Sequence, residues 1–178
     1  MICNQLEECI DIQRIQQKNV KCLQSQDECI EVSDCRSNVK CEEKKKKYIL
    51  ENTMGNHVIL YRMDGGIIKT DKSVPEGTCK CDYLMVVDGK ECDAILTELK
   101  GVDVKHALKQ IDGTLDQFKA VFNRFAHVYA RAVVTSSTPN LKATPTYVKL
   151  MNKLRRCYKG NLKIEEVQMK EKDIDLDK

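Results

Sequence analysis

The sequence contains no tryptophan, three prolines and three phenylalanines, and aromatic residues make up 5% of its 178 residues. This scarcity argues against a protein that binds single-stranded nucleic acid by stacking bases. No stretch reaches the roughly 18 apolar residues that a membrane-spanning helix needs, so we expect no membrane association. The first residues have no basic cluster, so no cleaved secretory signal is expected. Hydrophobic residues still make up 42% of the chain, enough for one domain with a core.

Acidic residues are missing from a long internal stretch, although the net charge of the whole chain is only +3. Residues 117–164 contain no Asp or Glu but ten cations: Lys119, Arg124, Arg131, Lys142, Lys149, Lys153, Arg155, Arg156, Lys159 and Lys163. A field of this sign attracts polyanions. We therefore expect this stretch to bind nucleic acid, and a solvated basic face is the alternative. The candidate contacts are Lys142, Lys149, Lys153, Arg155 and Arg156.

The ten cysteines do not follow the spacing of a structural zinc site. Six of them lie within the first 41 residues, and the gaps between them all exceed the two to four residues of a zinc knuckle. The chain also has enough apolar residues to form a core without disulfides. We expect reduced thiols in a cytoplasmic protein, with structural zinc as the less favoured alternative.

Residues 48–167 show the clearest pattern of secondary structure. Runs of β-prone residues at 58–61, 82–87 and 94–100 are separated by turn signals, which predicts an antiparallel meander of three strands. The pattern then predicts a helix over 103–124, a strand at 128–135, a helix over 145–158 and a final strand at 162–167. This order of elements predicts a three-layer α/β domain with a mixed central sheet.

The two flanking segments have less regular patterns. Residues 1–47 are polar and cysteine-rich and contain neither Gly nor Pro, so we expect a mainly helical extension that ends near the lysine run at 44–47. This extension is a candidate surface for a homodimer or a partner protein. The charged residues 168–178 are expected to form a disordered tail.

Two acids and a lysine stand out within the predicted meander. Glu98 and Lys100 share one face at the end of an otherwise apolar strand, and a tight hairpin would bring the carboxylate of Asp82 close to Glu98. Two neighbouring carboxylates need a cation between them, and oxygen ligands suit Mg²⁺ or Mn²⁺. Such a site can position water for phosphodiester hydrolysis, with Lys100 orienting the water or balancing phosphate charge. A structural ion pair between Glu98 and Lys100 is the alternative.

Asp82 followed by Glu98-Leu99-Lys100 resembles the signature of the PD-(D/E)xK nuclease superfamily. The order of elements over residues 48–167 is also similar to the αβββαβ core of that superfamily, the restriction-endonuclease-like fold. The resemblance implies cleavage of phosphodiester bonds that depends on Mg²⁺ or Mn²⁺, in DNA rather than RNA. It makes Asp82 and Glu98 the metal ligands and Lys100 the catalytic lysine.

The same resemblance suggests further candidate site residues. Members often carry a catalytic Gln on the helix after the lysine strand, where this chain has Gln110. Many have an additional acid, for which Glu43, Glu51 and Asp64 are candidates, and Cys81 stands in place of the proline of the motif. Two other functions stay open: a non-catalytic protein that keeps the fold and binds nucleic acid, and a protein that binds a partner through its cysteine-rich region.

Overall fold

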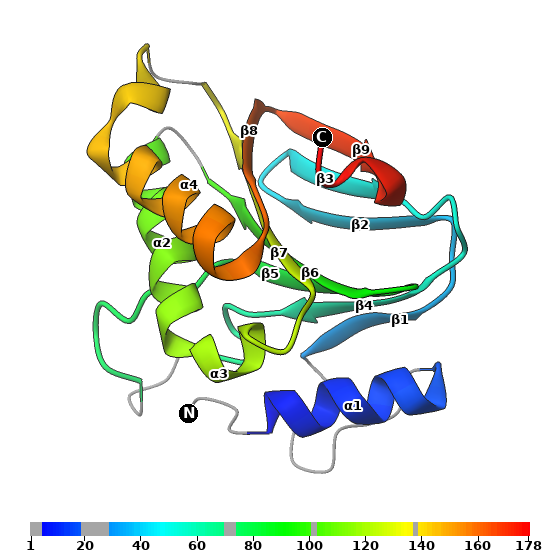
Figure 1. Cartoon of the computed structure of the whole chain (residues 1–178). Coiled ribbons are helices and arrows are strands. Elements are labelled where there is room, and N and C mark those ends of the chain that lie inside the picture. The colour runs from blue at the N-terminus through cyan, green and yellow to red at the C-terminus, as the bar shows by residue number, and fades with distance from the viewer. Residues whose placement is uncertain (1–4, 19–28, 70–73, 101–102, 137–138) are drawn as a thin grey trace.

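The computed structural model describes residues 5–18, 29–69, 74–100, 103–136 and 139–178. Its larger sheet has the strand order β1-β4-β5-β6-β7-β8. These strands are β1 (Ile30–Asp34), β4 (His57–Arg62), β5 (Tyr83–Asp88), β6 (Cys92–Leu99), β7 (His127–Val134) and β8 (Leu162–Glu166). Strands β1, β4, β5 and β6 pair antiparallel in turn, whereas β7 and β8 run parallel to β6. The central sheet is therefore mixed, and β4, β5 and β6 form the predicted antiparallel meander (Figure 1).

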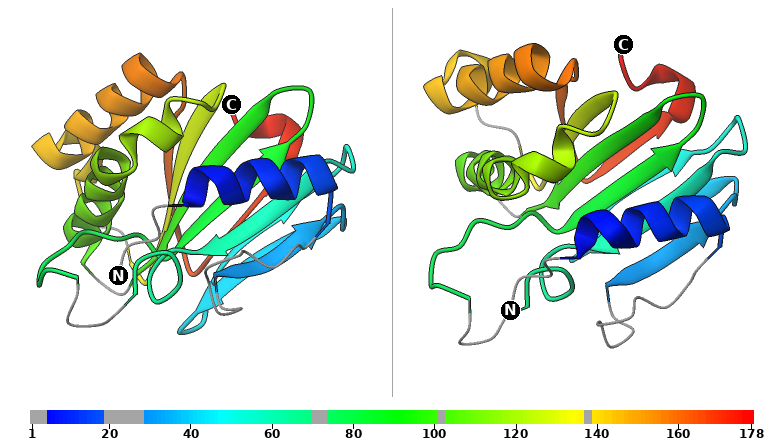
Figure 2. Two further views of the ribbon diagram at one scale, coloured as in Figure 1. Left: turned by 90° about the horizontal axis from the view of Figure 1, so that it is seen from below. Right: turned by 60° about the horizontal axis from the view of Figure 1, so that its bottom comes forward.

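Helices cover one face of this sheet (Figures 1 and 2). They are α1 (Leu6–Gln16), α2 (Val104–Gln117), α3 (Lys119–Phe122) and α4 (Pro145–Tyr158), with a short 3₁₀ helix η1 (Leu141–Ala143) before α4. The Asp103 carboxylate caps α2 by accepting a hydrogen bond of 2.9 Å from the backbone N–H of His106. Gly160 follows α4, where a side chain would meet the Val128 carbonyl oxygen at 1.8 Å, so glycine permits the close approach of this segment to β7.

A second, three-stranded sheet covers the other face. It has the order β2-β3-β9, with β2 (Asn38–Glu43) antiparallel to β3 (Lys46–Glu51) and β9 (Gln168–Lys172) parallel to β3. Buried residues of the small sheet, such as Tyr48, Leu50 and Met169, pack against Met85 and Ile95 of the large sheet. The protein thus has three layers, with helices on one side of the large sheet and a small sheet on the other. The α/β class and the mixed central sheet agree with the prediction, whereas the second sheet was not predicted.

The predicted helical extension at residues 1–47 is wrong for most of its described part. A helix forms only over Leu6–Gln16, and strands β1 and β2 follow. Along β2, buried Val39 and Cys41 alternate with exposed residues, which is the pattern of a strand with one covered face. Lys44 and Lys45 both adopt positive φ (45° and 67°) and form the tight turn between β2 and β3. The lysine run therefore belongs to a hairpin rather than to a helix end.

The predicted disorder of residues 168–178 is also wrong. This segment forms β9 and a 3₁₀ helix, η2 (Asp173–Asp175), and buries Met169 and Leu176 between the two sheets. Glu171 of β9 forms an ion pair with Arg131, which is fully buried on β7. Apolar burial and this buried pair hold the segment in place. Residues from both flanking segments therefore complete one sheet with β3, which lies at the start of the predicted nuclease-like core.

The two helices predicted for the core are confirmed with small changes of bounds. The helix expected over 103–124 is divided into α2 and α3, and α4 spans the residues predicted for it. Among the described residues, the thiols of Cys35, Cys41, Cys79, Cys81, Cys92 and Cys157 are free of disulfides. No helix in the described part of the chain is both long and apolar enough to cross a membrane.

Candidate nuclease site

Asp82 and Glu98 lie side by side on two neighbouring strands. The β5–β6 register pairs Tyr83 with Thr97, so Asp82, one residue earlier, lies opposite Glu98. Residues opposite each other in an antiparallel pair project to the same face, which here is the face covered by the helices. The predicted juxtaposition of the two acids is therefore present in the structure.

The Glu98 carboxylate is buried without a hydrogen-bond partner among the described residues. Its side chain is 1% exposed, and neither carboxylate oxygen accepts a hydrogen bond of normal geometry from a described residue; the neighbouring cation is Lys100, whose Nζ lies 3.6 Å from Oε1. Burial and the charge of Asp82 raise the pKa of Glu98 above its usual value. An acid in this position is destabilising unless a proton or a cation neutralises it.

The Asp82 carboxylate is more accessible and makes one strong contact. Its Oδ2 accepts a hydrogen bond of 2.6 Å from the backbone N–H of Leu99, which fixes the side chain against the end of β6. Burial raises the pKa of Asp82, and the charges of Glu43 and Asp64 act in the same direction. Several carboxylates thus surround one point at the end of the meander.

Lys100 is the cation next to the buried acid. Its Nζ lies 3.6 Å from Glu98 Oε1, and its side chain is 39% exposed. The backbone N–H of Lys100 donates to the carbonyl of Val133 at 2.9 Å, so β7 holds this residue in line with β6. Lys100 therefore extends from the buried carboxylate towards solvent.

Helix α2 positions the segment that leads into Asp82. The Gln110 side-chain oxygen accepts from the backbone N–H of Lys80 at 2.7 Å, and Thr114 Oγ1 accepts from the N–H of Cys81 at 2.9 Å. The Gln110 amide nitrogen also lies 2.8 Å from Nε2 of His106. The structure thus places Gln110, predicted as a catalytic residue, against the backbone two residues before Asp82.

A cavity of about 320 Å³ opens beside Asp82 and is lined mainly by acids. Its lining residues are Glu42, Glu43, Arg62, Asp64, Asp82 and Tyr83. The candidate acids Asp64 and Glu43 therefore lie with Asp82, whereas Glu51 lies at the far end of the β2–β3 hairpin and pairs with Lys170 at 2.8 Å. Asp64 also pairs with Lys80 at 2.7 Å.

Glu42 lines the cavity beside Asp82 but was not among the candidates from the sequence. It lies on a strand of the second sheet, and the sequence places β2 far from Asp82. No local pattern indicates that the β2–β3 turn closes over the end of β5, because that contact depends on how the two sheets pack.

The predicted nucleic-acid contacts do not form one free basic surface. Asp112 of α2 pairs with Lys149 at 2.9 Å and also with Lys153, which pairs in addition with Asp116 at 2.8 Å. Arg155 and Arg156 are exposed on the last turn of α4. Acids from α2 therefore neutralise part of the charge that the sequence places on α4.

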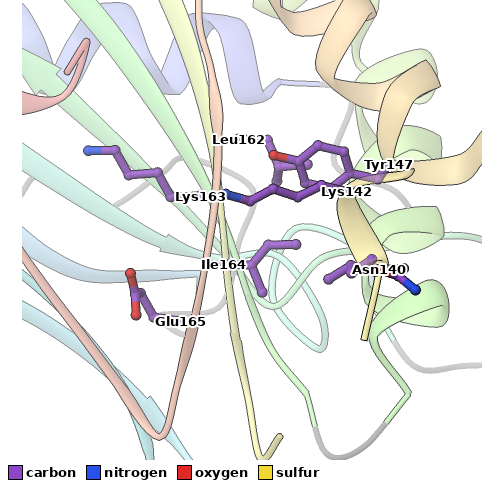
Figure 3. Close-up of a pocket in the computed structure, with 8 residues that line it drawn as sticks. Asn140, Lys142, Tyr147, Leu162, Lys163, Ile164 and Glu165 are labelled. Carbon is purple, nitrogen blue, oxygen red and sulfur yellow. The ribbon is translucent and has the colours of Figure 1, made fainter. Parts of the chain in front are cut away.

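Lys142 lies apart from this helix surface. It lines a separate cavity of about 490 Å³ between η1, α4 and the edge strand β8 (Figure 3). The cavity has an apolar floor that includes Leu162 and Ile164, and Tyr147 forms part of its wall. Neither Asp82 nor Glu98 contributes to it.

The fold and the site together define an α/β protein with a mixed sheet and a cluster of carboxylates at the end of its central strands. Comparison with family models, with curated proteins and with solved structures found no significant match for this chain.

Proposed function

We propose that this protein is a metal-dependent nuclease of the PD-(D/E)xK type that hydrolyses phosphodiester bonds in DNA. The observation that carries the proposal is the pair formed by Asp82 and Glu98, in which a buried carboxylate has no hydrogen bond of normal geometry to any described residue and has Lys100 as its neighbouring cation at 3.6 Å. A purely structural acid would be expected to have its oxygens satisfied. The burial of such a group is understandable if a cation takes the place of the missing donors.

The residues fit a hard divalent ion such as Mg²⁺ or Mn²⁺. Asp82 has one oxygen that is not occupied by the Leu99 N–H, and both oxygens of Glu98 lack a hydrogen bond to any described residue. Oxygen ligands of this kind suit Mg²⁺, which keeps several waters and binds phosphate. When bound, the ion would activate a water molecule and stabilise the charge that develops on the phosphate.

The chain's own residues would orient the reactants. The Leu99 N–H holds the Asp82 carboxylate in place, and α2 holds the backbone before Asp82 through Gln110. Lys100 is positioned to balance charge on the phosphate or to orient the water. Gln110 then acts as a positioning residue, because its contact is to the backbone and not to the carboxylates.

One observation favours a second candidate, a non-catalytic protein that keeps this fold and binds nucleic acid or a partner. Glu98 does not line the cavity next to Asp82, and Lys100 already lies 3.6 Å from its carboxylate. In this alternative Glu98 and Lys100 form a buried structural pair, and the protein binds without turnover.

Cleavage assays distinguish a nuclease from a non-catalytic binding protein. The protein is incubated with supercoiled plasmid, linear duplex, single-stranded DNA and RNA, each with Mg²⁺, Mn²⁺ or EDTA. We expect cleavage of DNA with metal, none in EDTA, and a loss of at least about 100-fold in rate for Lys100→Ala and Glu98→Gln, since such groups supply large electrostatic terms.

Glu51→Gln is the matched control, because it makes the same change on an acid that pairs with Lys170 away from the site. It should retain cleavage. Cleavage that persists in EDTA, or that survives in both Lys100→Ala and Glu98→Gln, contradicts the proposed mechanism. Binding to DNA without cleavage in any metal supports the second candidate instead.

A further inference from the structure

A second group of metal-binding side chains lies at the start of β6 and β7. The parallel register pairs Asp93 with His127, and the β5–β6 turn, closed by the Gly89 N–H to the Glu91 carbonyl at 3.1 Å, brings Glu91 beside them. Asp93 precedes Glu98 by five residues on the same strand, about 17 Å at roughly 3.4 Å per residue. Because the separation is odd, the two side chains project to opposite faces of the sheet. The group is thus separate from the candidate nuclease site.

The three side chains converge on one point. Nδ1 of His127 lies 2.9 Å from Asp93 Oδ1 and 3.6 Å from Glu91 Oε2, and the three candidate ligand atoms all lie within 4.8 Å of one another. Metal–ligand bonds of about 2.0–2.2 Å place neighbouring ligand atoms roughly 3.0–3.6 Å apart in tetrahedral or octahedral coordination. Small side-chain adjustments would therefore suffice to bind an ion.

The hydrogen bonds and charges of this group are incompletely balanced without a cation. A single Nδ1–H can donate fully to only one of the two carboxylates that face it. Among the described residues, no Lys or Arg forms an ion pair with Asp93 or Glu91. The His127 ring is held by stacking on Tyr129, with 5.9 Å between the ring centres, so one ligand is oriented in advance.

We propose that Glu91, Asp93 and His127 bind a divalent transition-metal ion of the Zn²⁺ class. One imidazole with two carboxylates suits such an ion better than Mg²⁺, which prefers oxygen ligands alone. Asp93 and His127 are partly buried, whereas the Glu91 side chain is 62% exposed, so water can complete the coordination from the solvent side. The bound ion joins the β5–β6 turn to the start of β7.

The test is titration of EDTA-treated, dialysed full-length protein with Co²⁺, followed by visible absorption and calorimetry. We expect a Co²⁺ site with nitrogen and oxygen ligands. His127→Gln should weaken it by more than about 100-fold, because loss of a residue that merely supports a ligand already costs 10–100-fold. Glu91→Gln should weaken it about tenfold, on the same scale.

Three controls make the outcome decisive. Glu91 is exposed, so Glu91→Gln leaves the fold intact, and circular dichroism verifies this for each variant. Because Co²⁺ can also bind carboxylate oxygens at Asp82 and Glu98, Glu98→Gln removes that second contribution, and the Co²⁺ binding that depends on His127 should remain in this variant. Cys92→Ser excludes a thiolate ligand from the residue between Glu91 and Asp93.

Three results would overturn the proposal. The first is the absence of Co²⁺ absorption, the second is the appearance of thiolate charge-transfer bands, and the third is absorption that is unchanged in Glu91→Gln and His127→Gln. In that case His127 and Asp93 form only a hydrogen bond, and Glu91 is a solvated turn residue. Cleavage activity is not part of this readout, so the result does not depend on the nuclease proposal.

Discussion

Replacing Glu98 by Gln should stabilise the metal-free protein, although under the proposed function it should slow cleavage by at least about 100-fold. The wild-type carboxylate is 1% exposed and has no hydrogen-bond donor among the described residues. An unsatisfied buried group costs more when it is charged than when it is neutral, so replacing the carboxylate by the neutral amide of Gln should raise the free energy of unfolding by about 1–3 kcal/mol at pH 8. For a chain of this size the gain corresponds to an increase of roughly 2–12 °C in Tm.

The effect should depend on pH with a definite sign. Burial and the charge of Asp82 raise the pKa of Glu98 in the folded state above that of the unfolded chain. Below the unfolded value of about 4.3, both states carry the proton and the burial of charge costs nothing. As the pH rises above that value, the unfolded state loses its proton first and the wild-type protein loses stability. The advantage of Glu98→Gln should therefore be small near pH 4 and increase towards pH 8.

Urea denaturation monitored by circular dichroism measures this difference, with the free energies obtained by linear extrapolation. Glu51→Gln is again the control, because its partner Lys170 is half exposed and such surface pairs contribute about 1 kcal/mol or less. If Glu98→Gln instead lowers the free energy of unfolding at pH 8 by 1 kcal/mol or more, on the scale expected for a broken buried pair, Glu98 and Lys100 form a stabilising ion pair and the reasoning is refuted.

Two further predictions concern the pH dependence of metal binding and the stability supplied by the buried Arg131. Because the pKa values of Asp82 and Glu98 are raised, a metal that binds them must displace protons. The affinity for Mn²⁺, measured by calorimetry, should therefore increase from pH 6 to pH 8, and binding should release protons. An affinity that does not change with pH contradicts this prediction. Arg131→Met should lower the free energy of unfolding by about 3–5 kcal/mol, because it removes a buried guanidinium that pairs with Glu171 and donates to Asn161 Oδ1 and the Leu176 carbonyl. Among the described residues, this leaves Glu171 with only Lys163 and Tyr48 as partners. Adding Glu171→Leu should recover part of the loss in urea denaturation, and a double variant less stable than Arg131→Met shows that the pair is not the cause.

The core elements could be predicted from the sequence because their signals are local. Strands β4, β5 and β6 have β-prone runs separated by turns, and α4 begins with Pro145 after a polar loop. The register that places Asp82 opposite Glu98 also follows from the short hairpin between them. These features depend on residues close in the chain.

The errors came from segments whose structure depends on distant residues. The lysines at 44 and 45 suggested a helix end, yet they form a hairpin turn because Val39 and Cys41 are covered by the large sheet. The terminal segment looked too charged to fold, yet it orders because Glu171 meets Arg131, 40 residues earlier in the chain. Neither partner can be identified from the local pattern.

The sequence by itself determined the mixed sheet, the two main helices on it and the positions of Asp82, Glu98 and Lys100, since periodicity and turn residues act over short distances. The tertiary structure decided which charged side chains are buried, which are paired and which face a cavity. It buried Arg131, paired Lys149 and Lys153 with acids of α2, and added Glu42 and Glu43 to the cavity beside Asp82. A count of charged residues along the sequence does not show which of them are close together in space. Burial and ion pairing depend on which surfaces the fold brings into contact, and the strength of each interaction depends on that distance.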